Sequence, residues 1–179
     1  MNLWHDIETG PETPKVVNVI VEIPKGSTNK YEYDKKNNLI RLDRVLFSPV
    51  YYPGDYGFIP KTLSEDNDPL DAIIILDKPT YPGVLVEARP IGVLMMEDNG
   101  ENDEKILCVI KGDPRFSKVN DIKDANEHEL KSIAHFFEVY KKLENKITKI
   151  QGWKDSGEAY KIISEAIERY EKKFNAEKH

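Results

Sequence analysis

The sequence predicts an α+β fold in which a small β-barrel carries helices on its outside. The first two-thirds of the 179 residues alternates short strand-like segments with turns. The last third contains two stretches with hydrophobic residues at helical spacing. Many short strands followed by two helices are typical of this class. No repeat or linker divides the chain, so we expect a single domain over residues 1–179.

The N-terminal segments have the composition of strands. Residues 16–23 are β-branched and apolar. Residues 30–34 and 39–46 flank the sequence KKNN, which favours a hairpin turn. Residues 71–76 follow as a continuous apolar run after one aspartate, which predicts a strand buried on both faces.

A loop and a second pair of strands complete this half. Residues 49–60, PVYYPGDYGFIP, predict a loop because prolines and glycines interrupt them. Residues 84–96 and 105–111 predict two strands around an acidic tip. In that tip, residues 97–104, five of eight residues are carboxylates. Taken alone, such a cluster is typical of a solvated hairpin end.

Two helices are predicted in the last third. Asn126 and Glu129 have capping-box spacing at the start of the first. Its apolar stripe consists of Leu130, Ile133, Phe136, Phe137, Tyr140 and Leu143. The second helix is expected over residues 157–174, with the stripe Ile162, Ile163, Ala166, Ile167, Tyr170 and Phe174.

Composition narrows the functional classes. Charged residues make up 32% and apolar residues 39%, and no run approaches the roughly 20 apolar residues of a membrane span. The N-terminus lacks the pattern of a secretory signal, so we expect a cytoplasmic protein with no membrane partner. A net charge of −6 disfavours nucleic acid as a partner. The single cysteine, Cys108, lies in an apolar run and is expected to be a buried small hydrophobe.

Three aspartates precede the most apolar strand. Asp66, Asp68 and Asp71 fall within six positions. Two carboxylates about 4 Å apart repel by roughly 1 kcal/mol in water and about 4 kcal/mol near a protein surface. Such a cluster needs cations or a proton, and the nearest lysines, Lys61 and Lys78, lie outside it. Hard divalent ions such as Mg²⁺ prefer carboxylate oxygens, so a metal site is one interpretation.

A calcium-binding loop and an ordinary turn are two other interpretations of the cluster. An EF-hand loop counted from Asp66 fails, because Leu70 and Asp71 stand where a ligand and a glycine are required. An ordinary turn around Asn67-Asp68-Pro69 remains an alternative. No Walker loop, GxGxxG motif or paired-cysteine zinc signature is present. His128 and His135 are seven residues apart on one predicted helix, which favours surface or interface positions over a metal pair.

Charged residues stand where predicted strands end. Lys30 and Glu32 share a face because side chains alternate along a strand. Arg44 ends the face that carries Ile40 and Leu42, where it either reaches to water or contacts an anion. Further strand ends carry Glu22, Asp71, Asp98 and Lys105. Charge at five strand ends favours a functional cavity.

Several segments together resemble a known family. The motif DNDPLDA at 66–72 resembles the signature of the soluble family I inorganic pyrophosphatases of prokaryotic type. Matching blocks follow in the expected order and span nearly the whole chain: VEIPKGSTNKYEYD (21–34), DRVLFSPVYYPGDYGFIPKTL (43–63), RPIGVLMMED (89–98) and IAHFFEVYKKLE (133–144).

The resemblance implies a five-stranded OB-like barrel with two main C-terminal helices outside. It also implies Mg²⁺-dependent hydrolysis of pyrophosphate to two orthophosphates by a metal-activated water, with several Mg²⁺ ions per site. The implied metal ligands are Asp66, Asp71, Asp98 and Asp103. Asp68 would accept or orient the proton of the water, and Glu22 and Glu32 would act through metal-bound waters.

The family's phosphate-binding positions correspond to Lys30, Arg44, Lys105, Tyr140 and Lys141, with Lys142 as the alternative if the register slips by one. Tyr52 and Tyr56 match two tyrosines that line the cavity, and Tyr56 is counted as catalytic. Tyr140 also belongs to the helical stripe, so periodicity alone places it in the core. Asn99 stands where some bacterial members carry glutamate, and we expect activity to survive with weaker Mg²⁺ affinity. Members of this type are usually homohexamers.

Two other functions stay open at this stage. An OB-fold binder of single-stranded nucleic acid would use the aromatic residues of 51–58, although the strand ends are acidic. A pseudoenzyme would keep the fold and act only as an oligomeric partner. Release of free phosphate from pyrophosphate, with and without Mg²⁺, separates both from the enzyme.

Overall fold

Five strands close into a barrel in the computed structural model, which describes residues 1–174. β1 (Val17–Ile23) pairs with both β4 (Asp55–Phe58) and β6 (Leu85–Asp98). β4 continues to β5 (Asp71–Ile75), and β5 to β8 (Lys105–Ile110), which returns to β6 and closes the ring. Only the β5–β8 pair of this ring is parallel. The five-stranded OB-like barrel is confirmed.

β4 corrects the prediction of an uninterrupted loop over residues 49–60. Residues 55–58 are a strand, and all four are buried. A Cβ atom on Gly57 would lie 1.9 Å from the backbone oxygen of Ile20 in β1. Glycine is therefore needed here because two strands approach closely, whereas in the sequence it resembled a turn signal.

The longest strand, β6, extends beyond the barrel. Its far end pairs with β7 (Glu101–Asn102) and with β9 (Thr148–Lys154). β9 does not follow from the sequence pattern, since its residues TKIQGWK lack a continuous buried face and are only partly buried. Pairing with β6 supplies the hydrogen bonds that make this segment a strand.

The predicted hairpin is confirmed as a separate two-stranded sheet, β2 (Asn29–Asp34) and β3 (Leu39–Val45). Its register skips Asp43, so that Lys30 lies opposite Arg44 while Tyr31 lies opposite Leu42. This bulge interrupts the alternation that the sequence predicted for Arg44.

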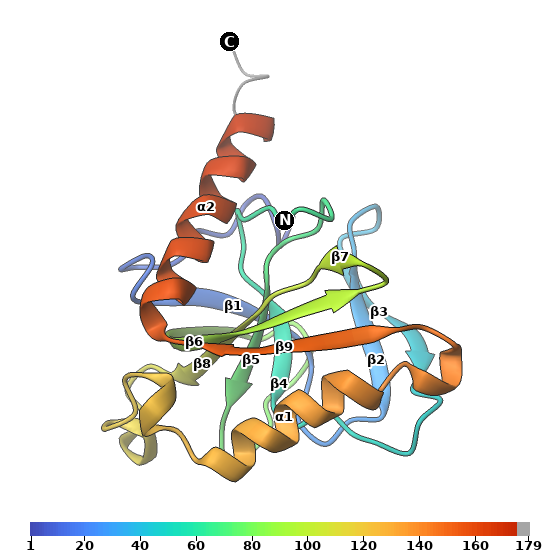
Figure 1. Cartoon of the computed structure of the whole chain (residues 1–179). Helices are drawn as coiled ribbons and strands as arrows, with labels where there is room; N and C mark the ends of the chain where they lie inside the picture. The colour runs from blue at the N-terminus through green and yellow to red at the C-terminus, as the bar shows by residue number, and fades with distance from the viewer. Residues whose placement is uncertain (175–179) are drawn as a thin grey trace.

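Two helices pack outside the barrel, as predicted (Figure 1). α1 (Glu127–Val139) begins at Asn126, whose side chain accepts hydrogen bonds from the amides of His128 and Glu129. α1 lies along β9, and α2 (Ser156–Phe174) crosses β6. Short 3₁₀ turns occur at Pro114–Phe116, Ile122–Asp124 and Lys142–Glu144, the last labelled η3. No helix within residues 1–174 has the length and apolar character to cross a membrane.

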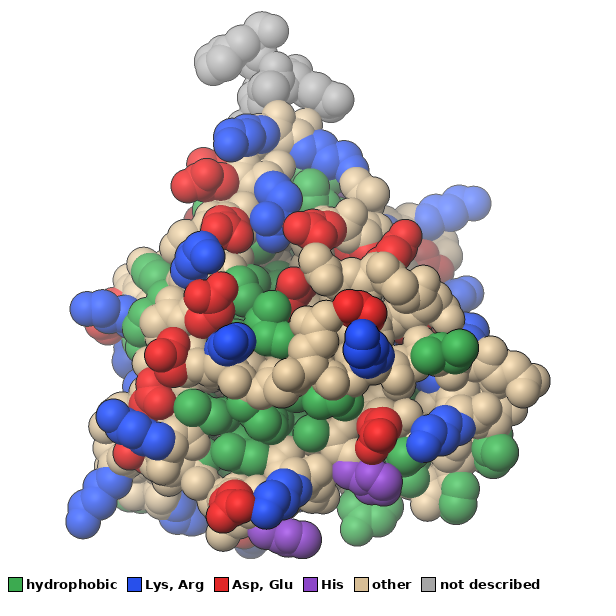
Figure 2. All heavy atoms as spheres, in the orientation of Figure 1, with side chains coloured by type: hydrophobic (Ala, Val, Ile, Leu, Met, Phe, Trp, Pro, Cys, Tyr) green, Lys and Arg blue, Asp and Glu red, His purple; other side chains and the backbone are tan. Residues whose placement is uncertain are grey.

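The core consists of three buried clusters around and inside the barrel walls. Cys108 belongs to one of them, and its burial raises the pKa of the thiol, as expected for an inert core residue. Charged side chains cover much of the surface, while hydrophobic side chains gather on the face over α1 and β9 (Figure 2). Asp71 is the first residue of the buried strand β5, so the three aspartates of 66–71 lie at the end of the barrel, next to solvent.

Candidate active site

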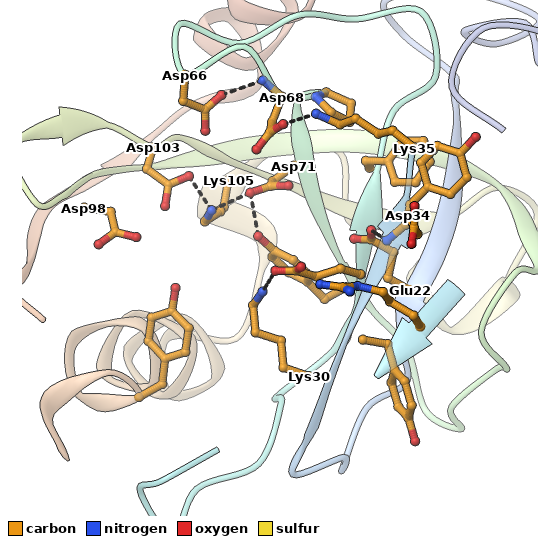
Figure 3. Close-up of a pocket in the computed structure, with 18 of the residues that line it drawn as sticks. Glu22, Lys30, Asp34, Lys35, Asp66, Asp68, Asp71, Asp98, Asp103 and Lys105 are labelled. Carbon is orange, nitrogen blue, oxygen red and sulfur yellow. Dashed lines mark hydrogen bonds and ion pairs between the residues drawn. The ribbon is translucent and has the colours of Figure 1, made fainter. Parts of the chain in front are cut away.

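A cavity of about 640 Å³ lies where the barrel, the β2–β3 hairpin and the end of α1 meet (Figure 3). All but two of the predicted site residues line it. They are Glu22, Lys30, Glu32, Tyr56, Asp66, Asp68, Asp71, Asp98, Asp103, Lys105, Tyr140 and Lys141. The fold thus brings together charges that the sequence distributes over more than a hundred positions.

Lys105 stands at the centre of the acidic side. Its side chain is buried, and its ammonium group binds Asp71 at 2.5 Å and also Asp103. The Tyr56 hydroxyl donates to the same carboxylate oxygen of Asp71 at 2.5 Å. Parallel pairing of β5 and β8 puts Asp71 directly beside Lys105.

These contacts decide which groups in this cluster carry charge. Burial opposes the charge of Lys105, but attraction to Asp71 and Asp103 prevails and holds its pKa well above the ordinary value. Burial, followed by the charge of Asp103, raises the pKa of Asp71 despite Lys105. Burial also raises the pKa of Tyr56 well above 10, so its hydroxyl remains a donor.

The aspartate loop is held in shape by its own backbone. Asp66 accepts a hydrogen bond from the amide of Asp68 at 3.0 Å, and the amide of Ser64 donates to the carbonyl of Asp68 at 2.8 Å. Asn67 adopts φ +68°, a region that asparagine tolerates. Burial, with the charges of Asp68 and Asp71 adding to it, raises the pKa of Asp66.

Thr62 anchors this loop to the core. Its fully buried hydroxyl accepts from the Leu70 amide at 2.9 Å and donates to the Ile59 carbonyl at 2.6 Å. The Trp4 indole N–H donates to the Thr62 carbonyl at 2.8 Å. The Thr62 hydroxyl therefore holds the two ends of the aspartate loop together, and its carbonyl connects the loop to the N-terminal segment.

We expect Thr62→Val to destabilise the fold by about 2 kcal/mol, because the methyl group leaves the amide and the carbonyl unpaired in the core. Thermal unfolding should show a Tm lower by about 6 °C, at the roughly 3 °C per kcal/mol typical of this chain length. Thr62→Ser keeps the hydroxyl and serves as the control. An unchanged Tm for the valine variant would contradict the anchoring role.

The end of α1 closes another side of the cavity. Lys141 forms an ion pair with Asp98, which ends β6, and the other oxygen of Asp98 is buried without a hydrogen-bond partner. Tyr140 is both buried in the core and part of the cavity wall, so the two interpretations of this residue are compatible. Lys142 is exposed and is not among the cavity residues, so the geometry favours Lys141.

Asn99 has a backbone reason for its identity. It adopts φ +51°, and its side chain accepts from the Ile147 amide at 3.4 Å. It is exposed and does not line the cavity. Asparagine suits this left-handed position better than glutamate does. Its effect on Mg²⁺ affinity stays a prediction.

The hairpin contributes the remaining charges. Lys30 pairs with Glu32 and lies 3.3 Å from Asp43. Glu22 accepts from the Tyr33 amide at 2.7 Å, which ties the barrel to the hairpin. Burial, then the charge of Asp71, raises the pKa of Glu22 to about 8. An acid in this state needs a nearby cation to be ionised at neutral pH.

Two predicted residues do not line the cavity. Arg44 pairs with Asp43 and Glu144, and it lies opposite the cavity residue Lys30 in the hairpin. Tyr52 is only 1% exposed, and its ring packs 5.5 Å from that of Tyr56 and 4.7 Å from that of Phe136. It supports Tyr56 from behind, and its direct contact with a substrate stays a prediction.

Sequence reasoning missed several cavity residues on the hairpin. Asp34, Lys35, Lys36 and Arg41 line the cavity, and Lys35 forms an ion pair with Asp68. Lys35 and Lys36 belong to the polar turn, and Asp34 and Arg41 are polar residues of the strands beside it, which is the usual composition of a solvated hairpin end. Figure 3 shows Lys35 directed toward Asp68 across the cavity.

The donor set suits a hard divalent cation. Within residues 1–174, no three His, Cys, Asp or Glu side chains are arranged as a ready metal site, since lysines pair with most of the acids. One carboxylate oxygen of Asp98 is buried without a hydrogen-bond partner, and burial raises the pKa of Asp66 and of Asp71, so a bound cation would favour the ionised form of these groups. Carboxylate oxygens are the ligands that Mg²⁺ prefers.

Comparisons with known proteins agree with the geometry. The family model described as inorganic pyrophosphatase matches residues 19–171. The inorganic pyrophosphatase of Synechocystis sp. is 52% identical over 167 residues, covering 92% of this chain and 99% of that protein. The crystal structure of inorganic pyrophosphatase from Thermus thermophilus superposes with a TM-score of 0.92 at 44% identity, covering 96% of this chain and 99% of that one. For the Helicobacter pylori inorganic pyrophosphatase the TM-score is 0.88 at 41% identity, covering 93% and 99%.

The OB-like barrel with its charged cavity, together with these matches, defines the class as that of the inorganic pyrophosphatases. The chain belongs to this family, in the soluble family I of prokaryotic type.

Proposed function

We propose that the chain, an inorganic diphosphatase by its family, hydrolyses pyrophosphate to two orthophosphates with Mg²⁺ and a water nucleophile. One observation carries this proposal. Among the predicted residues, five aspartates and five cationic or phenolic groups converge on one cavity from the barrel, the hairpin and the end of α1. Such a set suits a polyanion that is bound together with divalent cations.

Asp66, Asp71, Asp98 and Asp103 would hold the metal ions. Bound Mg²⁺ supplies charge neutralisation of the phosphoryl oxygens and lowers the pKa of a water molecule toward neutrality. Glu22 and Glu32 would orient metal-bound waters from behind. The chain's own part is to place these oxygens at the open end of a rigid barrel.

Asp68 is the residue we assign to the proton of the attacking water. It lies on the aspartate loop, lines the cavity and is well exposed, so a water molecule can reach its carboxylate although one oxygen pairs with Lys35. Tyr56 holds Asp71 through its hydroxyl and remains neutral. Asp68 would therefore act as the proton acceptor, while Tyr56 orients Asp71 for its role as a metal ligand.

Lys30, Arg44, Lys105, Tyr140 and Lys141 would bind the phosphates. Their charges and donors would stabilise the electrophilic phosphoryl group and the leaving phosphate as negative charge moves between them. In the free protein these lysines pair with acids of the same cavity. The phosphates of the substrate would therefore take over the lysines, and the metal ions would take over the carboxylates that those lysines release.

The test is phosphate release from pyrophosphate during a Mg²⁺ titration, followed by chelation with EDTA. We expect activity that requires Mg²⁺ and returns when excess Mg²⁺ is restored. A single-stranded nucleic acid binder or a pseudoenzyme with this fold releases no phosphate. Activity that is the same with EDTA as with Mg²⁺ would contradict the metal requirement.

We expect Arg44→Ala to raise the KM for pyrophosphate by about tenfold, or about 1.4 kcal/mol, because a phosphate contact is lost. The fold should survive with a modestly lower Tm, since Glu144 loses a partner. KM from initial rates and Tm from thermal unfolding measure the two effects. An unfolded variant would favour a purely structural role for Arg44.

We also propose a cytoplasmic homohexamer in which the whole chain forms one catalytic domain. Support for the assembly comes from the hydrophobic side chains that gather over α1 and β9 (Figure 2). His135 is an exposed residue of the same helix, α1. Light scattering after size exclusion should give roughly six times the chain mass of 20.6 kDa. A monomer mass at micromolar concentration would contradict the assembly.

A further inference from the structure

We propose that Glu144 is a positioning residue that holds Arg44 at the edge of the cavity; the inference rests on the proposed function. Arg44 Nε lies 2.8 Å from Glu144 Oε1, and Arg44 Nη2 donates to Oε2 at 3.2 Å. The two residues are 100 positions apart. Nothing in the sequence pattern singled out Glu144.

Burial makes this pair more than a surface contact. The Glu144 side chain is 6% exposed and the Arg44 side chain 22% exposed. A carboxylate buried to this degree needs a partner of opposite charge, because its desolvation is costly otherwise. Arg44 is the partner that the described residues provide.

Glu144 is built into the same turn as Lys141. The Lys141 carbonyl stabilises the η3 turn, because it accepts hydrogen bonds from the Glu144 amide at 3.0 Å and from the Lys146 amide at 3.3 Å. Asn145 ends the turn with φ +56°. The position of Glu144 is therefore fixed relative to a cavity lysine.

Arg44 is fixed relative to a second cavity lysine, Lys30. It lies opposite Lys30 in the hairpin, and Asp43 contacts both residues. The β2–β3 hairpin is a separate sheet, so backbone hydrogen bonds to the barrel strands do not fix the distance between the hairpin and α1. The Arg44–Glu144 pair, together with the hydrogen bond from Ser48 to the Val139 carbonyl, joins the two phosphate-binding groups of the cavity.

The guanidinium still has donors to offer. Arginine carries five N–H groups in a planar fork. Asp43 and Glu144 each take one as a hydrogen bond, and the buried Nε–H faces Glu144 without an aligned acceptor. The two carboxylates thus orient the guanidinium and leave N–H donors for a phosphate group. The oxygens of a phosphate match the planar fork of the guanidinium.

The experiment is a double-mutant cycle in the phosphate-release assay with Mg²⁺. It uses Glu144→Ala, Arg44→Ala and the double variant. We expect Glu144→Ala to raise the KM for pyrophosphate about fivefold with little change in kcat. In the Arg44→Ala background, the same change should leave KM unaltered, because Glu144 acts through Arg44.

Two further variants separate positioning from folding. Glu144→Gln keeps the shape and one acceptor oxygen, so it should fold normally and raise KM less than alanine does. Glu138→Ala removes an exposed glutamate at the end of α1 and should leave KM and kcat unchanged.

The outcomes distinguish the proposals from one another. Equal rises in KM in both backgrounds, or a lower Tm with unchanged KM, would overturn the positioning role of Glu144 alone. An Arg44→Ala variant with wild-type KM would remove Arg44 from the substrate site and the inference with it. A wild-type protein that releases no phosphate would refute the proposed function itself.

Discussion

Asp68→Asn is expected to fold like the wild-type protein and to lose turnover by about 10²–10³-fold, the range of a removed general base. An amide has nearly the same shape as the carboxylate but cannot take up the proton of water at neutral pH. The Asp68 side chain is 61% exposed and its ion partner, Lys35, is also partly exposed. Loss of that exposed pair costs little stability, so the effect should fall on the chemistry.

The measurement is kcat from phosphate release at saturating Mg²⁺ and pyrophosphate, with Tm recorded on the same preparation. Asp77→Asn is the matched control, because Asp77 is an exposed aspartate after β5 that does not line the cavity. Its kcat should equal that of the wild type. Near-normal turnover for Asp68→Asn would show that another group receives the proton.

Gly57→Ala is expected to destabilise the barrel by about 3 kcal/mol or more, since overpacking against backbone forces strands apart. The added methyl group would lie 1.9 Å from the Ile20 carbonyl oxygen and 2.9 Å from the Val21 Cα. These are backbone atoms of β1, which cannot rotate away as a side chain would. The strain falls on the β1–β4 pairing that closes the ring.

Thermal unfolding should place the Tm of this variant about 10 °C below that of the wild type, at roughly 3 °C per kcal/mol for this chain length. Gly157→Ala is the control. Its methyl group would meet only the flexible end of Asp155 at 3.3 Å, in the first turn of α2, where alanine favours the helix. A Gly57→Ala protein as stable as this control would mean that the barrel opens to accept the methyl group at little cost.

Local patterns predicted most of the elements correctly. β1, the hairpin, β5, β8 and both helices follow from composition and periodicity, because each has an apolar face or run matched to its own geometry. β4 and β9 were not predicted, because neither has such a pattern of its own. β4 contains the glycine that close packing requires, and β9 gains its pairing only from the far end of β6.

The candidate site shows the same division. The acids and bases were identified from strand ends and from resemblance to a family, and twelve of the fourteen line one cavity. Their partners were not identified, since Lys35 with Asp68 and Arg44 with Glu144 join segments 33 and 100 residues apart. Short-range spacing holds no information about such pairs.

By itself the sequence determined most of the buried segments other than β4, the positions where charged residues interrupt them, and the class of protein that these residues indicate. Only the tertiary structure decided which cation lies against which carboxylate, and that Arg44 pairs with Glu144 of the η3 turn as well as with Asp43 of its own strand. The physical reason is that burial and backbone geometry depend on neighbours along the chain. Ion pairs in a cavity depend on how the closed barrel, the hairpin and the helices come to lie together.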